Sequence, residues 1–201
     1  LANVIRLRDF EALDLISQTA EKLSSGEMLQ IEKSFRKTMT EDVYYRMIRD
    51  KTASLISTSC ELGVMTTSKN ESHKVALGSY GENLGMAFQI KDILGSQHST
   101  GKDTQSDVAK NMITLPIIHT LSLPLSPVER KQIEQALSNG ANRKEMKRLK
   151  EIVEERGGFE YAKHKINEYS DRAIERLSLF PDSPYKRSLI DLAVYNAQRT
   201  Y

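Results

Sequence analysis

Residue types that could bind a diphosphate through magnesium stand near the middle of the chain. Phe88, Gln89 and Asp92 lie close together, and Lys102 and Asp107 follow in a polar stretch. Mg²⁺ is usually bound by one or two carboxylates together with phosphate oxygens, and lysine ammonium groups can neutralise further phosphate charge. The sequence has no two adjacent aspartates, so a complete Asp-Asp-x-x-Asp metal cluster is absent from it.

Helical spacing would bring part of this set onto one surface. Gln89 and Asp92 are three residues apart and Phe88 and Asp92 are four apart, so each pair shares a helix face. The alternative interpretation is that this face is only a partly exposed helix end.

Further upstream, Lys51 and Thr52 lie in the middle of an apolar helical pattern, which would place the ammonium group beside an apolar wall. The alternative for Lys51 is a surface lysine whose stem covers apolar side chains.

The elements that must position these residues are predicted to be helices. Apolar residues recur at three- and four-residue spacing and strand-like alternation is missing, so the predicted fold class is all-α. Capping patterns mark several helix starts and ends, such as Thr40 before two acids and Ser126-Pro127 with Glu129. We expect helices at about residues 13–35, 40–63, 72–94, 126–140, 143–156, 159–179 and 183–199, with a polar loop at about 95–110.

Two features of these helices carry expectations about packing. Gly78, Gly81 and Gly85 each weaken their helix by roughly 1 kcal/mol relative to alanine. Such glycines indicate close helix packing, either inside the chain or at a contact between subunits. The preceding helix is expected to carry Tyr44 and Leu55 on one apolar face.

Composition excludes several classes of protein. The 201 residues suffice for one domain, and 39% apolar with 28% charged residues is ordinary for a globular protein. A net charge of +2 without a basic tract argues against nucleic-acid binding. The single cysteine, Cys60, excludes an internal disulfide and a thiolate zinc site, and its apolar surroundings predict a buried, unreactive thiol. A membrane span and a signal peptide are not predicted, so we expect a cytoplasmic protein.

A glycine-rich phosphate loop is not predicted. The segment 95–103 (GSQHSTGKD) has five residues between its glycines where the phosphate-loop pattern has four, and Asp103 stands where Ser or Thr must bind magnesium. It also follows a predicted helix instead of a strand.

Several ordered segments resemble one protein family. They are YYRMIRDKTASL (44–55), GENLGMAFQIKD (81–92), GKDTQSD (101–107) and NMITLP (111–116), preceded by GEMLQ (26–30). Together they are similar to the motifs of the trans-isoprenyl diphosphate synthases (polyprenyl synthetases) of bacterial type. The resemblance covers most of the chain and implies an isoprenoid-synthase-type helical bundle around a central cavity. It also implies that residues 1–201 form a single all-α domain, the C-terminal two-thirds of a longer synthase whose N-terminal helices are absent; the first residue, Leu1, agrees with this.

The resemblance implies a role for particular side chains. The substrate diphosphates and the pocket are assigned to Gln30, Lys51, Thr52, Phe88, Gln89 and Lys102. Magnesium, the implied cofactor, is assigned to Asp92 and Asp107. Catalysis is assigned to Lys51, Asp92 and Lys102. The implied reaction is a Mg²⁺-dependent prenyl transfer by ionisation, condensation and elimination, in which an allylic diphosphate is joined to isopentenyl diphosphate by a homodimeric enzyme.

The sequence also departs from the family pattern. After Asp92 the family has two further aspartates, whereas this chain continues with Ile93 and Leu94, and the first aspartate-rich motif is missing. Met112 stands where the family often has a lysine. Two interpretations remain open, an active synthase that lacks segments in this sequence and a non-catalytic partner subunit of a heteromeric synthase. A terpene cyclase is disfavoured, because cyclases generally lack the pairing of Lys51-Thr52 with Gly101-Lys102.

Overall fold

The computed structural model describes residues 2–36, 39–98, 113–138 and 141–199. All elements in these ranges are helical and none is a strand, which confirms the predicted all-α class. The elements are α1 (Ala2–Leu7), α2 (Phe10–Arg36), α3 (Glu41–Ile48), η1 (Arg49–Ala53), α4 (Ser54–Met65), α5 (Glu71–His98), α7 (Leu115–Ser122), α8 (Pro127–Ala136), α9 (Arg143–Glu155), α10 (Gly158–Arg176), η2 (Leu177–Leu179) and α11 (Pro184–Gln198).

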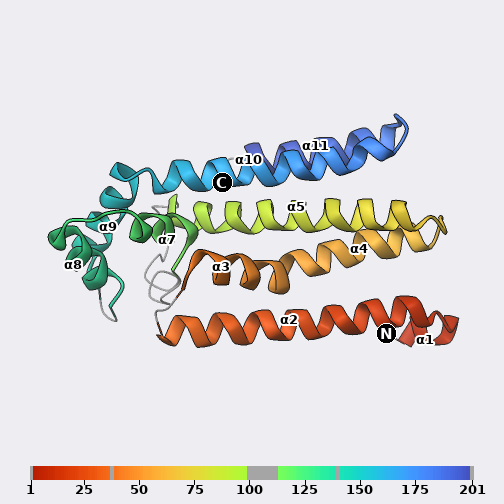
Figure 1. Cartoon of the computed structure of the whole chain (residues 1–201), viewed down its shortest axis with the longest axis horizontal. Helices are drawn as coiled ribbons and strands as arrows, with labels where there is room; N and C mark the ends of the chain where they lie inside the picture. The colour runs from red at the N-terminus through yellow and green to blue at the C-terminus, as the bar shows by residue number, and fades with distance from the viewer. Residues whose placement is uncertain (1, 37–38, 99–112, 139–140, 200–201) are drawn as a thin grey trace.

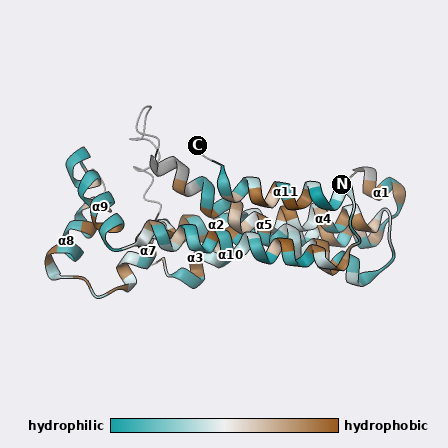
Figure 2. Ribbon diagram, turned by 90° about the horizontal axis from the view of Figure 1, so that it is seen from above, coloured by the Kyte–Doolittle hydropathy of each residue, from teal (hydrophilic) through white to brown (hydrophobic). Residues whose placement is uncertain are grey.

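Long helices stacked side by side form the body of the molecule. Figure 1 shows α2, then the rod made of α3, η1 and α4, then α5, then α10 with α11. Helix α5 is central, because it packs against α4 on one side and α10 on the other. The shorter helices α7, α8 and α9 lie at one end, and Figure 2 shows α8 and α9 beyond the long helices. Within the described residues, no helix combines the length and the apolar character that a membrane span needs.

The predicted helix caps are present. The Thr40 side chain accepts a hydrogen bond from the backbone N–H of Val43 at 3.4 Å. Ser126 and Glu129 form a reciprocal capping box at the start of α8. Gly157 has φ of 75°, the left-handed conformation that glycine adopts at low cost, between α9 and α10. The predicted helix end at residues 139–140 lies outside the described residues.

Three expectations about the helices need correction. The rod continues through Gly63 and ends at Met65. Leu55 does not share the buried face of Tyr44: Tyr44 is 0% exposed and Leu55 is 52% exposed. The reason is the π-helical turn η1, which inserts an extra residue and rotates everything after it. Helix α5 extends to His98, so the polar stretch starts later than expected, and the remainder, residues 99–112, is outside the described part.

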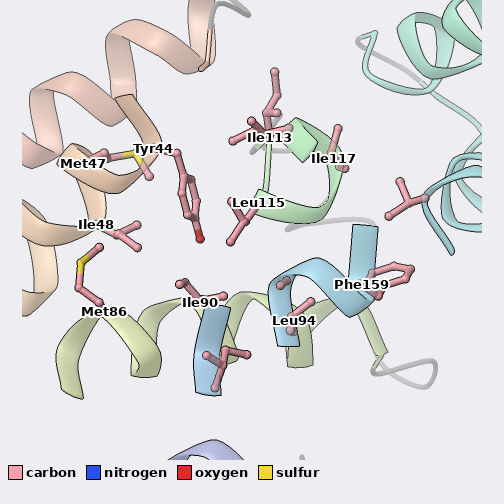
Figure 3. Packing of buried hydrophobic residues seen from close by; sticks show 14 of the residues in the cluster. Tyr44, Met47, Ile48, Met86, Ile90, Leu94, Ile113, Leu115, Ile117 and Phe159 are labelled. Atoms are coloured by element: carbon pink, nitrogen blue, oxygen red, sulfur yellow. The ribbon is translucent and has the colours of Figure 1, made fainter. Parts of the chain in front are cut away.

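The main core lies where the rod, α5, α7 and α10 meet (Figure 3). Its labelled members in Figure 3 are Tyr44, Met47, Ile48, Met86, Ile90, Leu94, Ile113, Leu115, Ile117 and Phe159. A second cluster of buried side chains, from Tyr80 to Ala193, joins α5 to α10 and α11. Cys60 packs against this second cluster but is only half-buried, less than predicted; burial raises the pKa of its thiol.

The glycines of α5 pack within the chain. A Cβ added to Gly78 would lie 2.8 Å from the side chain of Glu61, and one added to Gly81 would lie 2.8 Å from the backbone of Ile56. One added to Gly85 would lie 2.6 Å from the Cα of Ala53. The absent side chains therefore allow α5 to lie directly against α4 and η1, which confirms close packing and supports the intrachain alternative.

Candidate functional site

Lys51 connects η1 to α2. Its Nζ donates a hydrogen bond to Oε1 of Gln30 at 2.8 Å and forms an ion pair with Oε2 of Glu27 at 2.7 Å. Glu27 and Gln30 are three residues apart on α2 and so share a face. The ammonium group therefore lies against polar groups of α2 and not beside the expected apolar wall. The Lys51 side chain remains 34% exposed, so this arrangement faces solvent.

A glycine makes this contact between α2 and η1 possible. Gly26 is buried, and a Cβ added to it would lie 2.6 Å from the backbone N of Lys51. That distance is below any ordinary contact with a backbone atom, so only glycine allows the two backbones to approach this closely. The segment 26–30, singled out in the sequence, thus supplies both the close approach and the polar partners of Lys51.

Neighbouring residues of the π-helical turn reach different helices. In η1 the backbone N–H of Ser54 donates to the carbonyl of Arg49, a bond that spans five residues. Lys51 reaches α2, whereas the hydroxyl of Thr52 donates a hydrogen bond to Oε1 of Gln89 on α5 at 2.9 Å. Single π-turns inside helices occur frequently at functional sites.

A second polar contact joins α5 to the end of α11. Asp92 accepts a hydrogen bond from the guanidinium of Arg199, with which it forms an ion pair. The same guanidinium lies over the ring of Phe88, 4.8 Å from its centroid. Phe88 and Asp92 thus share one helix face, as their four-residue spacing predicts, and both contact one cation.

Positive charge gathers around this second contact. The pKa of Lys91 is lowered, first by burial and then by the charges of Arg199 and Lys163. Lys91 on α5, Lys163 on α10 and Arg199 after α11 together outnumber the Asp92 carboxylate, and such a local excess of positive charge attracts anions.

The polar contacts cross the helix stack as one row, which we call the polar row. It consists of Glu27 and Gln30 on α2, Lys51 and Thr52 on η1, Phe88, Gln89 and Asp92 on α5, and Arg199 after α11. Six predicted site residues, from Gln30 to Asp92, therefore lie in this row. Lys102 and Asp107 lie outside the described residues, so their predicted roles stay predictions.

Sequence reasoning missed two members of the polar row. Glu27 had a local signal, because its spacing from Gln30 places both on one helix face. Arg199 had none, because it meets Asp92 from 107 positions away in the chain.

Magnesium fits the polar row in part. Among the described residues, no group of three or more His, Cys, Asp or Glu side chains could hold a metal ion. Asp92 is nevertheless a carboxylate that already carries a cation, the guanidinium of Arg199. One carboxylate suits a magnesium ion whose other ligands are phosphate oxygens and water. The row therefore fits an ion that arrives with a diphosphate better than an ion held by protein alone.

The fold is that of the isoprenoid-synthase-type bundles. The structure superposes with a TM-score of 0.87 on a crystal structure of a polyprenyl synthase from Caulobacter crescentus, solved with calcium and isoprenyl diphosphate, at 25% identity. The match covers 98% of this chain and 61% of that one.

The family follows from the sequence comparison. A model of the polyprenyl synthetase family matches residues 1–155, and the chain belongs to this family. It is 28% identical over 202 residues to the octaprenyl diphosphate synthase of Haemophilus influenzae, covering 98% of this chain and 61% of the relative. It is 33% identical over 197 residues to the geranylgeranyl diphosphate synthase of Saccharolobus solfataricus, covering 94% and 59%. The chain thus spans about 60% of the length of these relatives.

Proposed function

We propose that the chain is the larger part of a prenyltransferase that condenses an allylic diphosphate with isopentenyl diphosphate to make a longer prenyl diphosphate. Membership of the polyprenyl synthetase family supports the proposal. The observation that carries it is the polar row, in which Lys51 is hydrogen-bonded to Gln30 and the next residue, Thr52, is hydrogen-bonded to Gln89. The cationic and amide groups of this row can bind diphosphate oxygens directly, and its carboxylates can do so through a magnesium ion.

Lys51 has the part of diphosphate clamp in this proposal. Its contacts with Glu27 and Gln30 fix the ammonium group at the surface before any substrate arrives, which lowers the ordering cost of binding. Gln30 then orients the clamp, Thr52 stands beside it in the chain, and Lys102 adds a second ammonium group.

Gln89 and Phe88 lie at the proposed reacting end. The Thr52 hydroxyl donates to the Gln89 carbonyl, which directs the amide NH₂ away from Thr52 and toward other acceptors. The ring of Phe88 is 36% exposed and offers a face to a cation, which suits a carbocationic substrate centre. Apolar helix surfaces would keep water away from that centre.

Asp92 and Asp107 are the proposed ligands of magnesium. When bound, magnesium would act as a Lewis acid that neutralises the charge of the departing diphosphate. Asp92 is 41% exposed at its side chain, so it is accessible from solvent at the polar row. A homodimer and a cytoplasmic location, both expected from the sequence, are part of the same proposal, and light scattering of the purified protein tests the first.

A non-catalytic partner subunit is the second candidate. The observation that favours it is the sequence after Asp92, where Ile93 and Leu94 occupy positions of the family's aspartate-rich motif. Such a subunit would form no product alone but would change the product yield of a catalytic relative mixed with it.

The deciding experiment measures incorporation of radiolabelled isopentenyl diphosphate into butanol-extractable product, with geranyl diphosphate and Mg²⁺. Lys51→Gln should lower kcat/KM for the allylic diphosphate roughly 10- to 100-fold, because a charged hydrogen bond contributes about 1.5–3 kcal/mol. Lys131→Gln is the matched control, since it removes the same charge from exposed α8. Equal activity of the two variants would contradict the proposed clamp. A chain that forms no product alone but changes the product yield of a catalytic relative mixed with it would favour the partner subunit.

A further inference from the structure

The cation at Asp92 comes from the chain itself. Arg199 stands directly after α11, and its backbone N–H donates to the carbonyl of Tyr195 at 2.8 Å, so the residue is still tied to the helix. From there its side chain reaches across to α5 and ends on the carboxylate of Asp92. Helix α11 packs against α5 as well as against α10.

Asp92 and Phe88 both hold the Arg199 side chain in place. The ion pair with Asp92 neutralises the carboxylate, and the ring of Phe88 supports the guanidinium at 4.8 Å. The Arg199 side chain is only 22% exposed, so most of it is covered by the rest of the chain. The contact is therefore more than a transient pair between two solvated surface groups.

Arg199 and a metal ion would use the same group. A carboxylate oxygen that accepts a hydrogen bond from a guanidinium cannot at the same time take a magnesium ion on that lone pair, and a metal ion on the second oxygen would still repel the guanidinium. A cation bound at Asp92 therefore weakens the ion pair with Arg199.

We infer that Arg199 is an autoinhibitory latch, an internal counter-ion that occupies Asp92 in the ligand-free chain and is displaced when a magnesium diphosphate binds. The inference rests on the proposed function, since it takes Asp92 as a ligand of the magnesium. The diphosphate makes the exchange favourable, because its negative charge both brings the metal and offers the released guanidinium a new partner. Displacement frees the last turn of α11 from α5.

Hydrogen–deuterium exchange of the last turn of α11 tests the latch on the whole chain. Adding Mg²⁺ with inorganic pyrophosphate should raise amide exchange in residues 195–199 severalfold. Arg199→Gln should exchange at this raised rate without ligand and should respond little to it. Arg187→Gln is the matched control: it removes the same charge from the same helix, twelve positions away or about 18 Å along the axis, and should behave like the unchanged chain.

A charge-neutral variant separates the latch from a general electrostatic effect. Phe88→Leu keeps both partners of the ion pair and removes only the ring under the guanidinium, so it should show intermediate exchange without ligand. If Phe88→Leu and Arg199→Gln both exchange like the unchanged chain, the latch is wrong.

Calorimetry of Mg²⁺–pyrophosphate binding separates the two proposals. Binding that leaves exchange in the last turn unchanged, or lowers it, would overturn the latch and leave the proposed function standing. Failure of the unchanged chain and of Arg199→Gln to bind would overturn the proposed function and the latch with it.

Discussion

Substituting Gly85 by alanine tests whether close contact between α5 and η1 positions the polar row. The new Cβ would lie 2.6 Å from the Cα of Ala53 and 2.9 Å from its Cβ. Ordinary carbon contacts are about 3.5–4.0 Å, so η1 and α5 must separate by roughly 1 Å. Overpacking of this kind costs about 1–3 kcal/mol, and the gain in helix propensity offsets about 1 kcal/mol of it. We expect a net loss of about 0–2 kcal/mol in the free energy of unfolding.

Gly63 provides the matched control for this substitution. It lies in the same rod, at an exposed helical position, and a Cβ added there meets nothing within 4 Å. Gly63→Ala should therefore gain about 0.5–1 kcal/mol from helix propensity alone. Urea denaturation followed by circular dichroism at 222 nm measures both variants. Their difference, about 1–3 kcal/mol or roughly 2–12 °C in Tm, isolates the steric cost. Equal stability of the two variants would refute the close packing of α5 on η1.

Three further predictions concern single side chains. The Cys60 thiol, whose pKa is raised by burial and by the charge of Glu61, should react with Ellman's reagent more slowly in the folded chain than in urea; equal rates would contradict its burial. The pKa of Glu129 is lowered to about 2, first by hydrogen bonds from Ser126 and then by Arg156, so it stabilises the fold above its unfolded pKa of about 4.5 and this stabilisation is lost as the pH falls toward 2. Unfolding of Glu129→Gln should then depend less on pH between 4.5 and 2 than that of the unchanged chain, and parallel pH profiles would contradict the assignment. Lys102→Ala should raise KM for the allylic diphosphate roughly 10- to 100-fold, and unchanged kinetics would remove Lys102 from the site.

Most of the fold could be predicted because its signals are local. Apolar spacing and capping residues act within a few positions of each other, so helix ends such as Thr40 and Gly157 were correctly assigned. The face of Leu55 was wrong for a physical reason. A π-turn adds one residue to the helical repeat, and the sequence pattern of a regular helix does not contain that addition.

The candidate site was predictable to the extent that its motifs are contiguous. Lys51 with Thr52 and Gln89 with Asp92 could be selected from their segments, but their partners could not be derived from local spacing. Thr52 meets Gln89 from 37 positions away, and Arg199 meets Asp92 from 107 positions away. Such contacts are set by how whole helices pack.

The position of η1 accounts for the contacts that Lys51 and Thr52 make in the polar row. The turn is held on one side by Gly26, whose missing side chain admits the backbone of Lys51, and on the other by Gly85, whose missing side chain admits Ala53. A regular helix fixed at both contacts would still place consecutive side chains about 100° apart, each on a fixed face. The π-turn lies between the two contacts, and from it Lys51 reaches α2 and Thr52 reaches α5. Two close glycine contacts thus hold the segment that joins polar groups of α2 and α5.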